Sequence, residues 1–438
     1  MNLVERAQAV LAQNRRGRWT CPSSAVYPHQ WLWDSCFIAI GVARYDPSRA
    51  ADELRALFRG QWGNGMLPHM IFADGVKDVG NKRVWRSKRH PLAPRDVDTS
   101  CITQPPLVAI AARRVADALP PGNRRTFLAE LFPKLVAYHS WLYAERDPKG
   151  SGLITLIHPW ECGLDTTPPW MLALERMPMP LWLRIASALR LARILRRLRY
   201  DTRHLPAVER PSDDDGLRML ALVTLAKQHD FDLRRLPLTR AVLIEDLAFN
   251  AMLIAANRAL EHIAAELDEA LPVALVGRFR STEGALETLW DDTTEQYYPR
   301  NAVTGELIRV PTIATFLPLW SGTLPTARAA QLVERLRQPT QFWPSFPVPS
   351  VPLDSPQFEA AGYWKGPAWV NTNWIIVEGL RAHGELELAE TLRRRTVDLV
   401  DAGGCFEYFS ALTGEGHGAA DFSWTAALAV ELIGDLDG

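Results

Sequence analysis

Acidic residues stand beside tryptophan at several points of this 438-residue sequence. They are Asp34 in HQWLWDS, Glu161 and Asp165 in HPWECGLDTTPPW, and Asp291 with Asp292 in LWDDTT. Tryptophan can stack on the C–H faces of a sugar ring, while carboxylates hydrogen-bond to its hydroxyls. The pattern therefore indicates a carbohydrate site, although core packing is an equal interpretation for any single tryptophan.

Asp165 is the first candidate for catalysis. Cleavage of a glycosidic bond needs one carboxyl group that protonates the leaving oxygen and a second that activates water or attacks the sugar. The indoles of Trp160 and Trp170 would desolvate Asp165 and keep it protonated near neutral pH. A helix N-cap is the alternative role, because Asp before Thr-Thr-Pro is a good helix start. By pattern alone Asp34 ranks equally, and for it we favour the role of a hydroxyl acceptor.

Glu407 is the second candidate and lies in the segment CFEYF. In a strand, alternation would point Glu407 away from the aromatic side chains next to it, so a solvent-facing position is the alternative. The Gly-rich segment GEGHG follows, and Trp424 stands at the start of the next helical pattern. This arrangement favours the rim of a site.

Other kinds of chemistry find little support. His29, His69, His158 and His417 lack HExxH or HxH spacing, so neither a metal nor a cofactor is expected. No GxSxG, Walker A or GxGxxG motif is present. The 49 Lys and Arg nearly balance 50 Asp and Glu, which argues against nucleic acid and anionic membranes as partners and favours a small neutral partner.

The cysteines and the apolar runs indicate a cytoplasmic protein. The five cysteines are odd in number and form no CxxC pair, so we expect reduced thiols. No apolar run approaches the roughly 20 residues that a membrane span requires. A homo-oligomer is compatible with the sequence, which does not define the oligomeric state.

Helical periodicity dominates the chain. Beyond an amphipathic start, helices are predicted at 47–61, 105–119, 124–145, 181–198, 216–227, 239–267, 327–337, 372–383, 385–399 and 423–433. Two β-hairpins are predicted, around Thr304-Gly305 and Thr413-Gly414, and Asp291 with Asp292 would have a structural role in the first. Long irregular connections at 18–34, 60–103, 150–170 and 338–369 carry the unusual residues. Together these features predict a toroid of paired helices with the site at its mouth.

Seven segments, in order, resemble glycoside hydrolase family 63, and specifically its short bacterial members that act on mannosylglycerate or glucosylglycerate. They are YPHQWLWDSCFIAIG, GMLPHMIF, HPWECGLDTTPPW, IEDLAFNAML, GYWKGPAWVNTNWIIVEGL, GCFEYFSALTGEGHG and DFSWTAAL. The resemblance implies an all-α (α/α)6 barrel in a single domain over 1–438, with insertions around 60–103 and 150–215 that cap the site. It also implies metal-free hydrolysis with inversion, with Asp165 as general acid and Glu407 as general base. For inversion the two carboxyl groups should be about 6.5–9.5 Å apart.

The resemblance further implies which residues bind substrate. The residues that match the sugar-binding segments are Tyr27, Trp31, Trp33, Asp34, Gln104, Trp160, Tyr363, Trp364, Lys365, Trp369 and Trp424. His69 and Arg210 are candidates for the aglycone side, where a glycerate carboxylate calls for a cation. The sequence departs from the family at Thr166-Thr167, where relatives commonly have Asn-Ser, and at Gly216, where a tyrosine is expected. The choice between mannose and glucose and the identity of the aglycone stay open.

Three other interpretations remain at this point. A trehalase or an oligosaccharide α-glucosidase would share the barrel and the two acids. A non-catalytic glycan-binding barrel would not require both acids, and a helical interaction scaffold would not require tryptophan beside acids in loops. We also expect the 60–103 connection to close over the substrate.

Overall fold

Six helices form a closed inner ring in the computed structural model, which describes residues 1–76, 79–178, 180, 184, 206, 209 and 212–434. Each inner helix packs against two others, and the last packs against the first. In ring order they are α2 (Leu32–Ala43), α5 (Val108–Ala118), α11 (Leu247–Leu267), the 3-10 helix η9 (Ile313–Ser321), α14 (Val370–Ala382) and α16 (Ser423–Gly434).

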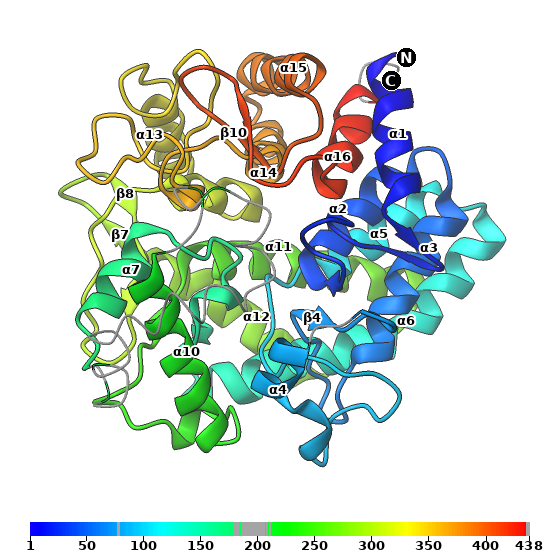
Figure 1. The fold of residues 1–438 in the computed structure, drawn as a ribbon, viewed down its shortest axis with the longest axis vertical. Helices are drawn as coiled ribbons and strands as arrows, with labels where there is room; N and C mark the ends of the chain where they lie inside the picture. Colours follow the sequence, from blue (N-terminus) through cyan, green and yellow to red (C-terminus); the bar gives the residue numbers. More distant parts are fainter. Residues whose placement is uncertain are drawn as a thin grey trace.

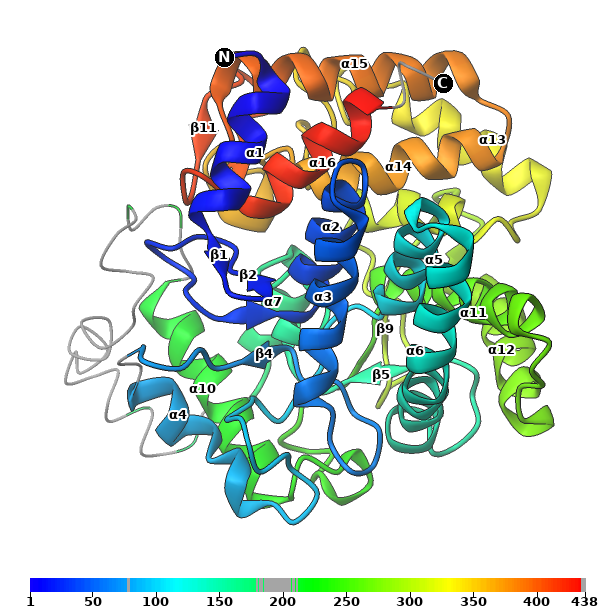
Figure 2. The ribbon, with the colours of Figure 1, turned by 90° about the vertical axis from the view of Figure 1, so that its right-hand side faces the viewer.

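A second set of helices lies outside the ring. Outer and inner helices alternate along the chain, and each outer helix packs on an inner one, as Figures 1 and 2 show for α1 beside α16 and for α3 beside α2. The outer helices are α1 (Leu3–Gln13), α3 (Pro47–Leu57), α6 (Pro121–Trp141), α12 (Val273–Leu286), α13 (Thr326–Leu336) and α15 (Leu386–Gly403). The predicted (α/α)6 fold class is confirmed.

Burial explains why the sequence did not reveal two of the inner elements. The outer helix α13 buries one stripe, formed by Ala329, Leu332, Val333 and Leu336, and so shows helical periodicity. In α2 all twelve residues are buried, so no polar face marks the period, and this helix was not predicted. The inner element η9 was missed for the same reason, and α12 was missed as well.

The predicted helix boundaries differ from the structure by up to four residues, except for one larger error. The helix expected at 239–267 begins only at α11, because β6 (Ile244–Glu245) pairs with two other strands. Asp246 then caps α11 by accepting a hydrogen bond from the backbone N–H of Phe249 at 2.9 Å. The helix predicted at 181–198 lies outside the described residues, apart from Arg184.

Short strands tie the connections together near the site. Each has two residues: β1 (Arg15–Arg16) pairs with β2 (Trp19–Thr20), β3 (Gln30–Trp31) with β4 (Met70–Ile71), β5 (Thr155–Leu156) with β6, β6 with β9 (Arg300–Asn301), β7 (Trp290–Asp291) with β8 (Gln296–Tyr297), and β10 (Tyr408–Phe409) with β11 (Gly416–His417). Both predicted hairpin turns are present, since Gly305 N–H donates to the Asn301 carbonyl at 2.8 Å and Gly414 N–H donates to the Ser410 carbonyl at 2.9 Å.

The two longest connections between the paired helices contain further short elements. Residues 58–107 join α3 to α5 and contain η1 (Phe58–Gly60), β4, α4 (Val79–Trp85) and η2 (Ser87–Arg89). Residues 142–246 join α6 to α11, and their described parts include η3 (Leu142–Arg146), η4 (Pro159–Glu161), α7 (Pro168–Glu175), α10 (Asp213–Gln228) and η7 (Leu233–Arg235).

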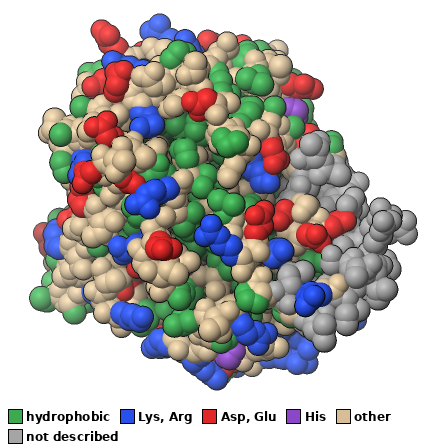
Figure 3. All heavy atoms as spheres, turned by 90° about the vertical axis from the view of Figure 1, so that its left-hand side faces the viewer, with side chains coloured by type: hydrophobic (Ala, Val, Ile, Leu, Met, Phe, Trp, Pro, Cys, Tyr) green, Lys and Arg blue, Asp and Glu red, His purple; other side chains and the backbone are tan. Residues whose placement is uncertain are grey.

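The surface carries mixed charge. Figure 3 shows acidic and basic side chains interspersed over one face of the molecule. Among the described residues, no helix combines the length and the apolar character that crossing a membrane would require.

Candidate active site

Glu407 is buried and surrounded by hydrogen-bond donors. Its side chain is 1% exposed. The hydroxyls of Tyr27 and Tyr363 donate to Oε1 at 3.1 and 3.2 Å, and the backbone N–H of Ala419 donates to Oε2 at 3.0 Å. These three donors fix the orientation of the carboxyl group. The alternative that Glu407 faces solvent is wrong.

The main chain around Glu407 is fixed from two sides. Phe409 exchanges backbone hydrogen bonds with Ala368 at 2.8 and 2.9 Å, which places β10 next to Trp369. The Glu407 N–H donates to the Ala419 carbonyl at 2.9 Å. A Cβ on Gly418 would lie 2.6 Å from Glu407 Oε2, so glycine is needed where the chain passes the carboxylate.

Asp165 lies half-buried in a turn that precedes α7. Gly163, with φ +77°, allows this turn to pack on Trp33, because a Cβ there would lie 2.7 Å from the indole. The Trp364 N–H donates to Thr166 Oγ1 at 3.4 Å, which ties the turn to a second tryptophan of the site. The N-cap of α7 is Thr167, so the N-cap alternative for Asp165 is wrong.

Asp34 joins the two candidate acids from the first turn of α2. It is 4% exposed. Burial, followed by the negative charges of Glu407 and Asp165, holds the pKa of Asp34 well above its usual range. Three carboxyl groups from distant parts of the chain therefore share one site. A carboxyl group that keeps its proton can donate to a sugar hydroxyl as well as accept from one.

Aromatic rings pack around these carboxyl groups. The rings of Trp364 and Trp369 stack at a centroid distance of 3.7 Å, and Trp33 packs edge-on against Trp424 at 5.4 Å. Tyr363 packs on Trp369 at 5.2 Å. These five rings form what we call the aromatic cluster. Its four tryptophans are buried, so the partly exposed rings near the site are those of Tyr27, Trp31, Trp160 and Tyr363.

His69 and Trp160 lie next to Trp31 at the candidate site. The His69 ring packs against Trp31 at 5.1 Å and stacks with Trp160 at 6.3 Å. Burial, aided by the positive charge of His158 when protonated, lowers the pKa of His69 to about 3. His69 is therefore neutral at physiological pH. It does not supply the cation that we expected on the aglycone side.

The remaining predicted residues have different placements. Gln104 is buried, and its Oε1 accepts from the backbone N–H of Trp33 at 3.5 Å. Lys365 forms an ion pair with Glu359 at 3.2 Å, a residue outside the predicted set. Arg210 lies outside the described residues.

The competing acids have structural partners. Glu161 is fully buried and pairs with Arg146 at 2.7 Å, and it also accepts from the Ile157 N–H at 2.8 Å. Asp291 pairs with Arg309 and accepts from the Thr293 N–H at 2.8 Å within the β7–β8 hairpin, which precedes the predicted hairpin around Thr304-Gly305. Neither acid is free to serve as a catalytic group.

No group of three or more His, Cys, Asp or Glu in the described part of the chain could hold a metal ion. His158 shows a structural use of histidine: its Nδ1 accepts from the Trp160 N–H at 3.1 Å, and its Nε2 lies 3.1 Å from the Met219 carbonyl. All five cysteines are buried and free.

Glu209 is a residue that the sequence did not point to. Its carboxylate contacts His417 Nδ1 at 3.2 Å and accepts from the Gly418 N–H at 3.0 Å. The next residue, Ala419, holds the carboxylate of Glu407. The signal was weak, because no aromatic or glycine pattern surrounds Glu209. The geometry makes it a positioning residue for Glu407.

We expect E209A to lower kcat about 10-fold and to change KM less. Losing hydrogen bonds to a charged group costs about 1.5–3 kcal/mol, part of which would appear as disorder of Glu407. E209Q should retain more activity, because an amide oxygen can still accept from Gly418. The measurement is steady-state kinetics alongside thermal unfolding. The control is E415Q, which changes an exposed carboxylate on the β10–β11 hairpin that Glu209 contacts. Equal kcat in E209A and E415Q would contradict the role.

Glu53 supports the segment that carries Trp31 and Asp34. It is 2% exposed, and its Oε1 accepts from Ser35 Oγ at 2.5 Å and from Gln30 Nε2 at 3.4 Å. Burial raises the pKa of Glu53 to about 7, although hydrogen bonds from Ser35 and Thr20 oppose the rise. The folded protein therefore favours the protonated form.

This raised pKa predicts a pH-dependent stability. Because the pKa of Glu53 is raised in the folded protein, protonated Glu53 stabilises the fold. This stabilisation is complete below the unfolded-state pKa of 4.5 and is lost as the pH rises through about 7. The loss is on the order of 3 kcal/mol. E53Q should match the wild type near pH 5 and unfold at a higher temperature at pH 8. The exposed E130Q serves as control, and an unchanged pH dependence in E53Q would exclude Glu53 as the source.

The chain is similar to known proteins over nearly its whole length. A family model described as the mannosylglycerate hydrolase MGH1-like glycoside hydrolase domain matches residues 27–425. The chain is 40% identical to a mannosylglycerate hydrolase from Thermus thermophilus over 97% of this chain and 99% of that protein. It is 32% identical to a glucosylglycerate hydrolase from Mycolicibacterium hassiacum over 99% and 98% of the two chains.

A solved structure is also similar. The crystal structure of a family 63 mannosylglycerate hydrolase from Thermus thermophilus in complex with Tris superposes with a TM-score of 0.88 at 38% identity, covering 98% of this chain and 99% of the other.

Proposed function

Because this chain belongs to the mannosylglycerate hydrolase MGH1-like family of glycoside hydrolases, within family 63, we propose that it hydrolyses a glycosylglycerate to the free sugar and glycerate. The substrate would be 2-O-α-mannosylglycerate or 2-O-α-glucosylglycerate. Relatives that carry either name are similar to the chain over their full length. This small anionic glycoside replaces the neutral partner that the charge balance favoured.

The environment of Glu407 carries the proposed mechanism. Two tyrosine hydroxyls and one backbone N–H converge on its carboxylate, and these contacts support an oriented general base. It would take a proton from a water that attacks the anomeric carbon. Asp165, half-buried in the turn before α7, would donate a proton to the glycosidic oxygen as glycerate leaves.

The other site residues would divide between the two halves of the substrate. We assign the cleaved sugar to Asp34 and the partly exposed rings of Tyr27, Trp31 and Tyr363, with the aromatic cluster as support. His69 would contact the aglycone as a neutral hydrogen-bonding group. The carboxylate charge of glycerate would fall to Arg210. The connections 60–103 and 150–215 would cap the site in a single catalytic domain.

A panel of substrates tests this proposal. Purified protein is incubated separately with mannosylglycerate, glucosylglycerate, trehalose and maltotriose, and released sugar is quantified. We expect kcat/KM at least 100-fold higher for one glycosylglycerate than for trehalose. Preference for trehalose would favour a trehalase, preference for maltotriose an oligosaccharide α-glucosidase, and no turnover a non-catalytic glycan-binding barrel. The free buried cysteines support action in the cytoplasm.

The proposed mechanism also predicts the stereochemistry of the product. A base that activates water opposite the leaving group inverts the anomeric carbon, so the α-glycoside should release the β-sugar first. Proton NMR spectra taken within the first minutes of turnover would resolve the anomers before mutarotation. Initial release of the α-sugar would instead require Glu407 to act as a nucleophile.

A further inference from the structure

A cavity of about 650 Å³ lies beside the predicted substrate-binding rings. It is bounded by the segment after β4, which includes α4 and η2, and by the end of α10 together with η7. Trp85 lines it, and the Trp85 ring lies 5.4 Å from that of His69 and 6.1 Å from that of Trp160. His69 and Trp160 do not line the cavity, so Trp85 is the residue that connects it to the rings near the candidate site.

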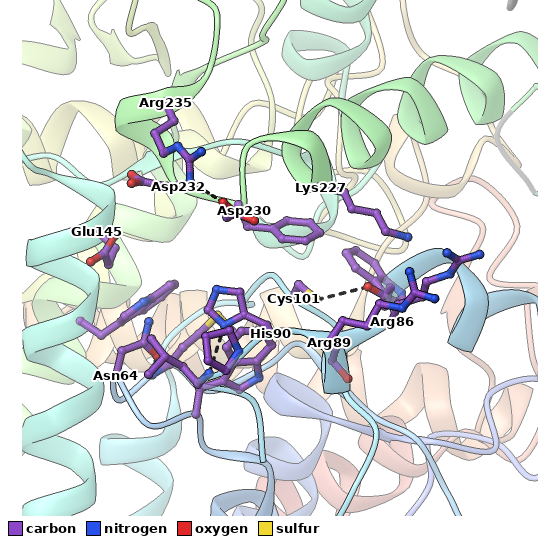
Figure 4. Close-up of a pocket in the computed structure, with 18 of the residues that line it drawn as sticks. Asn64, Arg86, Arg89, His90, Cys101, Glu145, Lys227, Asp230, Asp232 and Arg235 are labelled. Atoms are coloured by element: carbon purple, nitrogen blue, oxygen red, sulfur yellow. Dashed lines mark hydrogen bonds and ion pairs between the residues drawn. The ribbon is translucent and has the colours of Figure 1, made fainter. Parts of the chain in front are cut away.

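The charges that line this cavity do not balance. Six cationic side chains face three acidic ones. Three of the cations have carboxylate partners: Arg234 pairs with Asp232 and Glu145, Arg235 with Asp230, and Arg146 with the buried Glu161. Figure 4 shows Arg235, Asp232 and Glu145 at one end and the remaining cations, Arg86, Arg89 and Lys227, together at the other.

These three remaining cations lie close together. Lys227 is held at the C-terminal end of α4, where its ammonium group donates to the backbone carbonyls of Val84 and, at 3.3 Å, Arg83. Burial and then the positive charge of Arg86 lower the pKa of Lys227, with a smaller contribution from Arg89. No carboxylate among the described residues forms an ion pair with any of the three. An anion between them would relieve this repulsion.

Aromatic rings form the other walls of the cavity. Trp62, Trp85, Trp141 and Phe231 line it, and the rings of Trp85 and Phe231 lie 6.0 Å apart. Rings of this kind pack on the C–H faces of a sugar, and cavities of roughly 300–1,000 Å³ suit small ligands. A ligand that matches both features carries a sugar ring and a compact group with more than one negative charge.

We propose that this cavity binds a sugar phosphate, with the phosphoryl group between Arg86, Arg89 and Lys227 and the sugar ring against Trp85 and Phe231. One guanidinium group can hydrogen-bond to two phosphate oxygens at once, so Arg86 and Arg89 suit a phosphoryl group. Arg86 and Arg89 are exposed, so replacing them should not disturb folding. The site is separate from Asp165 and Glu407 and takes no part in the proposed hydrolysis.

Isothermal titration of the full-length protein with glucose 6-phosphate tests the proposal. We expect one site per chain and binding at least 10-fold weaker in R86Q/R89Q. The control R83Q/R113Q removes the same charge from exposed positions that do not line the cavity, and its affinity should stay within 2-fold of the wild type. Glucose should bind at least 10-fold more weakly than glucose 6-phosphate. The basal hydrolytic activity of R86Q/R89Q should equal that of the wild type. The readout is binding, so it does not depend on the proposed hydrolysis.

Several outcomes would overturn the assignment. Absence of binding by the wild type at 10 mM ligand, or equal binding by the two double variants, would show that these cations are merely solvated. Inorganic phosphate that binds as tightly as glucose 6-phosphate would remove the role of the aromatic walls. Competitive inhibition of glycoside hydrolysis by glucose 6-phosphate would place the anion in the catalytic site instead.

Discussion

Replacing Glu407 with glutamine should lower kcat by about 10²- to 10⁴-fold, the range over which a positioned acid or base contributes to catalysis. Glutamine is nearly isosteric, so the hydroxyls of Tyr27 and Tyr363 can still donate to its amide oxygen. What is lost is the ability to accept a proton from the attacking water. The expected result is therefore a loss in kcat with little change in KM.

The E407Q experiment needs a test that the site has kept its shape. Thermal unfolding should change by only a few degrees, and binding of the substrate to E407Q by titration should stay within about 10-fold of the wild-type KM. The variant Y363F removes one hydrogen-bond donor to Glu407 Oε1 but leaves the carboxylate in place. It should therefore lose far less activity than E407Q. An E407Q protein with more than about a hundredth of wild-type kcat would remove Glu407 from the role of base.

The sequence predicted the outer half of the fold better than the inner half. Helix α13 buries a single stripe, so its period was visible, whereas every residue of α2 is buried and its sequence carries no period. The first turn of α2 carries Asp34, so the same burial concealed how this carboxyl group reaches the site. The start of α11 was predicted too early, because the two-residue strand β6 lies directly before the helix and was not recognised.

The candidate site shows a similar division. Tryptophan beside acids directed attention to Asp34, Asp165 and Glu161, but only the three-dimensional arrangement separates them, because Glu161 is paired with Arg146 while the charge of Asp165 acts on Asp34. Strand alternation also left a solvent-facing Glu407 as an alternative to a position at the rim of the site. Contacts between residues hundreds of positions apart, such as that of Tyr27 with Glu407, leave no periodic trace in a sequence.

The positioning residues were the hardest to foresee. Glu209 acts on Glu407 through backbone atoms of Gly418 and Ala419, so its own neighbours in sequence carry no sign of the role. Glu53 lies on the buried face of α3, where an acid is uncommon, and that is the one signal that a search for charged residues at apolar helix positions could use.

Replacing Asp165 with asparagine should produce a loss that depends on the leaving group. Asparagine cannot donate a proton to the glycosidic oxygen, so kcat on the glycosylglycerate should fall by about 10²- to 10⁴-fold. Fluoride is a far better leaving group and departs without a proton. The α-glycosyl fluoride of the same sugar should therefore be hydrolysed by D165N at a rate within about 10-fold of the wild type.

The comparison of the two substrates separates the roles of the three carboxyl groups. E407Q should be impaired on the fluoride as severely as on the glycosylglycerate, because both reactions need an activated water. D34N should also be impaired on both, since the sugar that Asp34 is proposed to bind is common to them. If D165N lost activity equally on both substrates, Asp165 would be a binding residue, and the general acid would have to be sought elsewhere in the site. The leaving-group dependence is thus the property that only a proton donor confers, and it tests the division of labour between Asp165 and Glu407 without reliance on the distance between them.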